Sequence, residues 1–242
     1  MDNQPLIPEE ISKLCSLCAE EMAKSDPATS GPQVLTPKQR EENLLVRMEE
    51  IALFRIQRLT RGLTTLLETL DRLSEEDPSQ FPPSLMKAWE SIAALKPLDV
   101  NELLENPISL KEYYGLSVEV LEKCYATASH EFESGHYQQA ADILFYLSAL
   151  DPDNSLFWLA LGNAEFYCSN YWDALQDYRL AFYTNPHDPR SLLYGAHCYE
   201  ALHKKDAALE TVELAVKVAS EDASLEEYQR EAKNYYTQLK AA

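Results

Sequence analysis

The chain has 242 residues, of which 45% are hydrophobic and 25% charged, a balance typical of folded proteins and unlike that of disordered ones. Its formal net charge of −19 makes nucleic acid and anionic lipid poor partners. The N-terminal residues lack the pattern of a signal peptide, and no apolar run is long enough to span a membrane, so we expect a cytoplasmic protein without membrane insertion.

The first predicted element is a short amphipathic helix over residues 7–24, followed by a linker rich in proline and glycine. Cys15 and Cys18 form a CSLC motif on this helix, but no second pair of Cys or His lies nearby to complete a zinc site. We therefore expect the two thiols on the apolar face of the helix and no bound metal. The chain has 5 cysteines, and their odd number and wide spacing favour a reducing compartment.

A long helix is predicted from Pro37, which Thr36 caps, to about Leu73. Apolar residues recur along it in alternating steps of three and four, which predicts a coiled-coil seam: Leu45, Ala52, Ile56, Leu59, Leu63, Leu66, Leu70 and Leu73. The helix that packs on this seam could come from a second copy, from residues 7–24, or from a helix that begins at Pro83. Residues 1–106 are thus expected to form an N-terminal helical hairpin or coiled-coil extension, with a possible homodimer through its helices.

The same helix carries four arginines in an otherwise acidic protein: Arg47, Arg55, Arg58 and Arg61. They could form a dock for an acidic partner, or a solvated face balanced by nearby glutamates. The second interpretation is favoured, because charged runs on helices usually face solvent.

The second half of the chain contains an internal repeat. Ala140, Ala174 and Ala208 are each separated by 34 residues, which divides the sequence into units 121–154, 155–188 and 189–222. The middle unit has the fullest set of aromatic and small residues: Trp158, Leu161, Gly162, Tyr171, Ala174, Tyr178, Ala181 and Pro186. This pattern resembles the tetratricopeptide repeat, in which small residues let two antiparallel helices approach and aromatic residues fill the space beside them.

The resemblance implies an all-α fold, with three tetratricopeptide repeats and a capping helix over residues 224–239 that covers the last repeat. Repeats of this kind stack into an array, and the first helix of each repeat lines a concave groove. The resemblance assigns these positions to the groove: Tyr125, Ser129, Phe132, Leu156, Leu159, Asn163, Phe166, Tyr167, Leu193 and His197. The set is mostly apolar and aromatic, which suits an extended peptide held by hydrophobic side chains. Trp158 and Tyr178 are instead expected in the core.

Residues 107–242 also resemble a more specific group, the translocator chaperones of bacterial type III secretion (the SycD/LcrH/IpgC group). The likeness lies in a leader with Leu110 and Gly115, then Tyr125, Phe132, and a Gly-x-Tyr at Tyr137. It implies that the groove binds an extended segment of a secreted translocator or effector and keeps that protein export-competent, with Tyr137 added to the binding residues. The first 106 residues are much longer than the leader of that family.

Two other functional classes compete with a chaperone. Catalysis is not expected, because no Ser or Cys is placed beside a His and an acid, and no cofactor motif is present. The remaining alternative is a tetratricopeptide scaffold or adaptor, in which the N-terminal helices set the oligomeric state.

Overall fold

In a computed structural model of the chain, the described residues are 37–76, 90–95 and 108–241, together with Ser12, Cys15, Ser16 and Ala19. These residues form helices and connecting turns, and no strand occurs among them. The chain divides into two compact units, Met1–Thr60 with Lys96–Ile108, and Arg61–Leu95 with Ser109–Ala242. We call the second of these the repeat unit.

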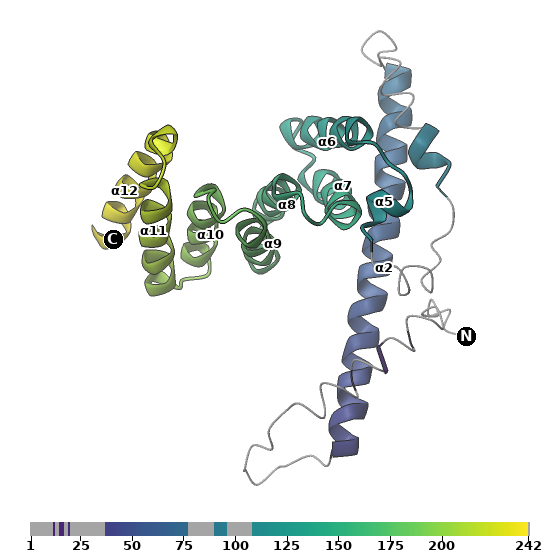
Figure 1. The fold of residues 1–242 in the computed structure, drawn as a ribbon, viewed down its shortest axis with the longest axis horizontal. Helices are drawn as coiled ribbons and strands as arrows, with labels where there is room; N and C mark the ends of the chain where they lie inside the picture. The colour runs from purple at the N-terminus through teal and green to yellow at the C-terminus, as the bar shows by residue number, and fades with distance from the viewer. Residues whose placement is uncertain are drawn as a thin grey trace. The chain divides into compact units, whose positions relative to one another are not determined.

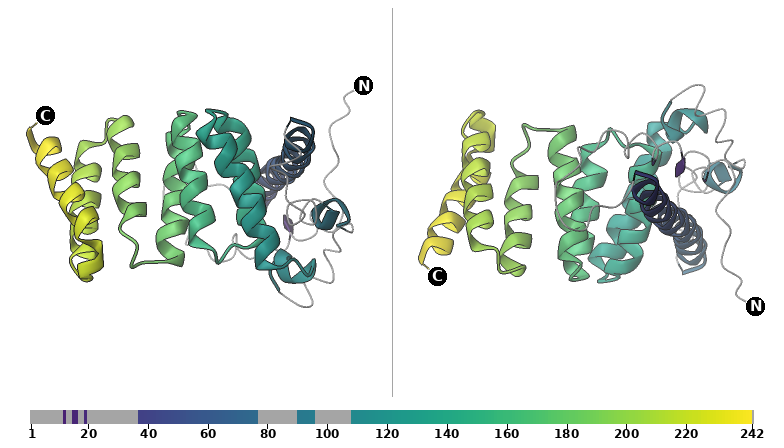
Figure 2. Two further views of the ribbon diagram at one scale, coloured as in Figure 1. Left: turned by 90° about the horizontal axis from the view of Figure 1, so that it is seen from above. Right: turned by 90° about the horizontal axis from the view of Figure 1, so that it is seen from below.

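Three antiparallel helix pairs make up most of the repeat unit. They are α6 (Val118–Glu133) with α7 (Tyr137–Leu150), α8 (Ser155–Tyr167) with α9 (Tyr171–Thr184), and α10 (Arg190–Ala201) with α11 (Lys205–Ala219). Each pair also packs on the next, through α7 with α8 and α9 with α10, and Figures 1 and 2 show the helices side by side in chain order. One pair falls in each predicted unit, with α6 starting three residues early, so the three-repeat fold is confirmed.

The two helices of each pair are joined by the same tight turn. Gly135, Ser169 and His203 occupy equivalent positions, 34 residues apart, and all have positive φ, at 82°, 64° and 57° respectively. The residue after each of them donates its backbone N–H to a carbonyl five residues earlier, as His136 does to Glu131 over 2.9 Å. A left-handed residue at this point satisfies the last carbonyls of the first helix and reverses the chain.

Small residues let the helices of each pair approach closely. Ala140, Ala174 and Ala208 are all completely buried, as the repeat pattern predicts. Trp158 is half-buried, and its indole N–H donates to the carbonyl of Pro152 over 2.7 Å, which links α8 to the turn before it. Tyr178, predicted in the core, has 3% of its surface exposed.

The capping helix is present as α12 (Glu226–Ala241), preceded by the short 3-10 helix η1 (Ala223–Leu225). Ala232, Tyr235 and Leu239 are buried in one apolar cluster with residues of α10 and α11. This cluster covers the apolar face that the third repeat would otherwise expose to water. A second short helix, α5 (Leu110–Tyr113), precedes the first repeat and begins with a capping box at Ser109 and Glu112.

The long N-terminal helix is α2 (Pro37–Glu76), and its residues from Arg61 onward belong to the repeat unit. Gly62 lies so close to α7 that an added Cβ would stand 2.3 Å from the backbone oxygen of Asp142. The Arg61 side chain also pairs with Asp142, over 3.5 Å, and Arg72 pairs with Glu131 of α6. Among the four arginines predicted to lie on a solvated face, Arg47 and Arg55 are exposed, whereas Arg58 is buried.

The sequence predicted a domain boundary at residue 106. In the structure, residues 61–95 belong instead to the same compact unit as the repeats. On the predicted seam, Leu66 and Leu70 are completely buried and Leu45 is half-buried. The predicted linker, the start of the helix at Pro83 and the thiol of Cys18 lie outside the described residues. Cys15 and Ala19, which are described, are helical and buried.

Candidate functional site

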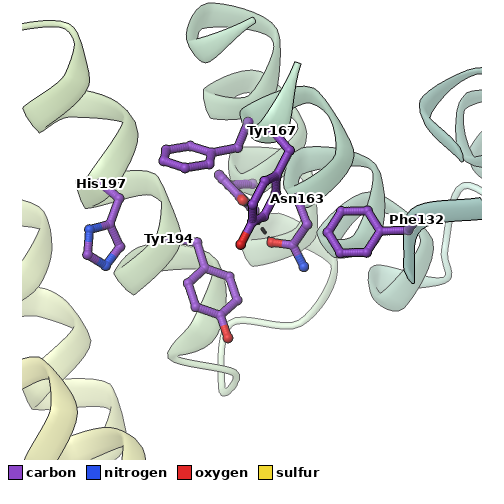
Figure 3. Close-up of a pocket in the computed structure, with 7 residues that line it drawn as sticks. Phe132, Asn163, Tyr167, Tyr194 and His197 are labelled. Carbon is purple, nitrogen blue, oxygen red and sulfur yellow. Dashed lines mark hydrogen bonds between the residues drawn. The ribbon is translucent and has the colours of Figure 1, made fainter. Parts of the chain in front are cut away.

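A hollow of about 410 Å³ opens in the repeat unit between the first helices of the three repeats. Seven residues line it: Phe132, Asn163, Phe166, Tyr167, Tyr178, Tyr194 and His197. They come from α6, α8, α9 and α10, so the hollow exists only because the repeats stack. Figure 3 shows Asn163 in the middle of this lining, with Phe132 to one side and His197 to the other.

One wall of the hollow is a connected group of aromatic rings. The ring of Tyr167 stacks on Tyr137, with centroids 4.8 Å apart, and meets Phe132 edge-on at 5.3 Å. Phe166 continues the contact at 6.0 Å from Tyr167, and Tyr171 lies 5.3 Å from Phe166. Edge-on and offset contacts are the arrangements that aromatic rings prefer, so the wall is held in place without a ligand. Tyr167 is still 58% exposed and offers its outer surface for binding.

The floor of the hollow contains one polar contact. The hydroxyl of Tyr178 donates to Oδ1 of Asn163 over 2.8 Å, as the dashed line in Figure 3 marks. Burial, and to a smaller extent the neighbouring Cys198 and Tyr194, raises the pKa of the Tyr178 hydroxyl. The hydroxyl therefore keeps its proton across the ordinary pH range.

The far end of the hollow joins the capping helix. His197 stacks on Tyr235 of α12, with ring centroids 4.0 Å apart, and the Tyr235 hydroxyl donates to Oε2 of Glu200 over 2.6 Å. Burial lowers the pKa of His197 below its ordinary 6.5, while Glu200 and Glu231 act in the opposite direction. The imidazole is thus neutral at pH 7, which suits an apolar binding surface.

The structure brings together five of the predicted binding residues and places the others elsewhere. Leu159 and Leu193 are 4% and 1% exposed and lie in the core. Tyr125 is half-buried and stacks on Phe157 at 5.8 Å, Ser129 is half-buried, and Leu156 is exposed. Tyr137 stacks on Tyr167 in the aromatic wall but is not among the residues that line the hollow.

Two lining residues were not predicted. Tyr194 lies at a repeat position outside the groove pattern, and no signal in the sequence pointed to it, since the third repeat has fewer tyrosines than the other two. Tyr178 was assigned to the core, and it is buried, but its hydroxyl end reaches the hollow.

The described part of the chain offers no candidate metal site. Its His, Cys, Asp and Glu residues form no group of three that could hold a metal ion. Burial raises the pKa of the Cys124 and Cys198 thiols to about 12, so neither is an activated nucleophile. Among the described helices, none is both long and apolar enough to cross a membrane.

Comparison with known proteins identifies the fold. No family model and no curated protein matches the chain. Among solved structures, the translocator chaperone SycD of Yersinia enterocolitica superimposes with a TM-score of 0.52, at 21% identity, over 54% of this chain and 98% of its own. The repeat unit has the fold of a type III secretion translocator chaperone.

Two further structures support the translocator-chaperone fold. A type III secretion complex from Aeromonas hydrophila matches with a TM-score of 0.55 and 21% identity, over 59% of this chain and 95% of that one. PcrH, a protein from Pseudomonas aeruginosa, matches in its complex with the chaperone binding region of PopD. Its TM-score is 0.51 and its identity 26%, over 52% of this chain and 96% of PcrH. The resemblance to the translocator chaperones that the sequence predicted is thereby confirmed.

Proposed function

We propose that this protein is a type III secretion chaperone that binds an extended, apolar segment of a translocator or effector in the hollow of the repeat unit. The observation that carries the proposal is the hollow itself, about 410 Å³ in volume and lined by five aromatic side chains, a neutral imidazole and one amide. Aromatic anchors bury a large area while few torsions become fixed, and such residues dominate the energetics of peptide binding.

The comparison with PcrH supports this proposal. PcrH shares 26% of its residues with this chain and binds the chaperone binding region of PopD. A client held in the same way would be kept from aggregating before export, and we propose that the protein acts in the bacterial cytoplasm. Five of the eleven residues predicted from the sequence to bind the client line this hollow, and Tyr178 and Tyr194 join them.

Client binding can be tested by co-expression with candidate translocators and by pull-down. Phe132→Ala, Phe166→Ala and Tyr194→Ala each remove an aromatic surface from the hollow, and we expect each to weaken binding by tenfold or more. Tyr183→Ala is the matched control, because Tyr183 is 87% exposed on α9 and does not line the hollow.

If all three variants bound the client as the wild type does, the hollow would not be the binding site. That result would favour the adaptor, in which partners engage other surfaces. A loss of binding confined to the hollow variants, with Tyr183→Ala unaffected, is the outcome expected of a chaperone.

A further inference from the structure

Only one of the two polar atoms of the Asn163 amide is bonded to another described residue. Oδ1 accepts the hydroxyl proton of Tyr178 over 2.8 Å, and within the described part of the chain no residue bonds to Nδ2. Asn163 is half-buried in the middle of the hollow, so Nδ2 faces the space that a client would fill. An amide nitrogen there carries two N–H donors and no acceptor.

Tyr178 is held firmly enough to fix the orientation of this amide. Its ring packs closely against Gly162, where an added Cβ would stand 2.6 Å from Cε1 and 2.7 Å from Cδ1. The ring is 97% buried among residues of α8, α9 and α10, being 3% exposed. Because burial raises the pKa of its hydroxyl, Tyr178 remains a donor, and the amide oxygen must turn toward it.

We propose that Tyr178 is a positioning residue, and that through it Asn163 donates from Nδ2 to a backbone carbonyl of the client. This inference rests on the proposed function and specifies what the hollow recognises. An apolar segment offers few acceptors other than its backbone carbonyls, and a carbonyl buried against aromatic rings without a donor is costly. Asn163 supplies that donor at the centre of the aromatic lining, so the hollow selects an extended backbone as well as apolar side chains.

The test uses the full chain and two synthetic peptides. One peptide is the chaperone binding region of PopD, and the other is the client segment that remains protected from protease in the co-expressed complex. Each backbone amide of the peptide is replaced in turn by an ester, whose carbonyl is a weaker acceptor, and affinity is measured by isothermal titration calorimetry. The variants are Asn163→Leu, which removes the donor, and Tyr178→Phe, which keeps the ring and removes the hydroxyl.

We expect one ester position to weaken binding to the wild type by about three- to tenfold, the contribution of one hydrogen bond. The same ester should have no effect on binding to Asn163→Leu, and a reduced effect with Tyr178→Phe, in which the amide is free to turn. If Tyr178 had only a structural role, Tyr178→Phe would lower the affinity for every peptide and leave the effect of the ester on affinity unchanged. A smaller ester effect in this variant therefore shows that Tyr178 positions the amide.

Two results would overturn the inference, and both are distinguishable from failure of the proposed function. If every ester had the same effect on the wild type and on Asn163→Leu, the donor would have no backbone partner. If Tyr178→Phe retained the full ester effect, Tyr178 would not position the amide. If neither peptide bound the wild type, the proposed function would fail. If Phe132→Ala weakened peptide binding but Asn163→Leu left the effect of every ester on affinity unchanged, only the role of Asn163 would be refuted.

Discussion

Gly162 determines how closely the Tyr178 ring approaches α8. Because a Cβ at residue 162 would overlap the ring at 2.6 Å, we predict that Gly162→Ala destabilises the protein by about 1–3 kcal/mol, as overpacking does. Gly195→Ala is the matched control, since its Cβ would meet Leu175 at an ordinary 3.6 Å. That change should be neutral or stabilise by up to about 1 kcal/mol through helix propensity. Urea unfolding measures both, and equal effects of the two substitutions would show that the contact with Tyr178 is unimportant.

His197 makes the stability of the protein depend on pH. Its pKa in the folded protein lies below the value of about 6.5 expected when unfolded, so the unfolded chain binds the proton more readily. We predict that His197 contributes a loss of stability as pH falls from about 7 through its folded pKa, and none above that range. Urea midpoints at pH 7.5 and 5.5 should therefore differ less in His197→Gln than in the wild type. His187→Gln, at an exposed residue, is the control, and an unchanged pH dependence in His197→Gln would contradict the assignment.

At the scale of elements, the turn within each repeat contains a left-handed residue, yet only the first repeat has glycine there. Ser169 and His203 adopt φ values of 64° and 57°, a conformation that costs a residue with a side chain about 1 kcal/mol. We predict that Ser169→Gly and His203→Gly each stabilise the protein by about 0.5–1 kcal/mol in thermal or urea unfolding. Gly135→Ala should destabilise it by about 1 kcal/mol, although no atom lies within 4 Å of the added Cβ. The opposite signs test the backbone explanation, and a stabilising Gly135→Ala would refute it.

The contact between α2 and the first repeat depends on close approach at Gly62. We predict that Gly62→Ala separates the second half of α2 from α7, because its Cβ would stand 2.3 Å from the oxygen of Asp142. Unfolding free energy should fall by about 1–3 kcal/mol, and amide hydrogen exchange in residues 61–76 should accelerate. Gln57→Ala, at an exposed position of the same helix, should change neither measurement. Unaltered exchange in Gly62→Ala would mean that α2 is held to the repeats by other contacts.

For the molecule as a whole, the sequence was most informative where one pattern repeats. The 34-residue period predicted six helices and the burial of Ala140, Ala174 and Ala208. It could do so because the two helices of each repeat pack against each other at the same positions. Short elements such as α5 and η1 were not predicted, since three or four residues carry no periodicity. The seam on α2 indicated that a helix would pack there, but nothing in its pattern identified α7 as a neighbour. Tyr194 was missed because repeat positions describe an average groove, and the hollow depends on how these particular side chains pack.

The first half of α2 carries a part of the predicted coiled-coil seam that is not fully buried. Leu66 and Leu70 are completely buried, whereas Leu45, Ala52, Ile56 and Leu59 are only half-buried, so the first half of α2 retains apolar surface for another helix. We predict a homodimer through this half, with a thermal midpoint that rises with protein concentration. Ile56→Asp should yield a monomer by light scattering, because it places a charge in the seam. Gln57→Asp adds the same charge at an exposed position and should remain dimeric. A wild-type protein that is monomeric at every concentration would rule out this assembly and leave the half-buried seam to be covered within the chain.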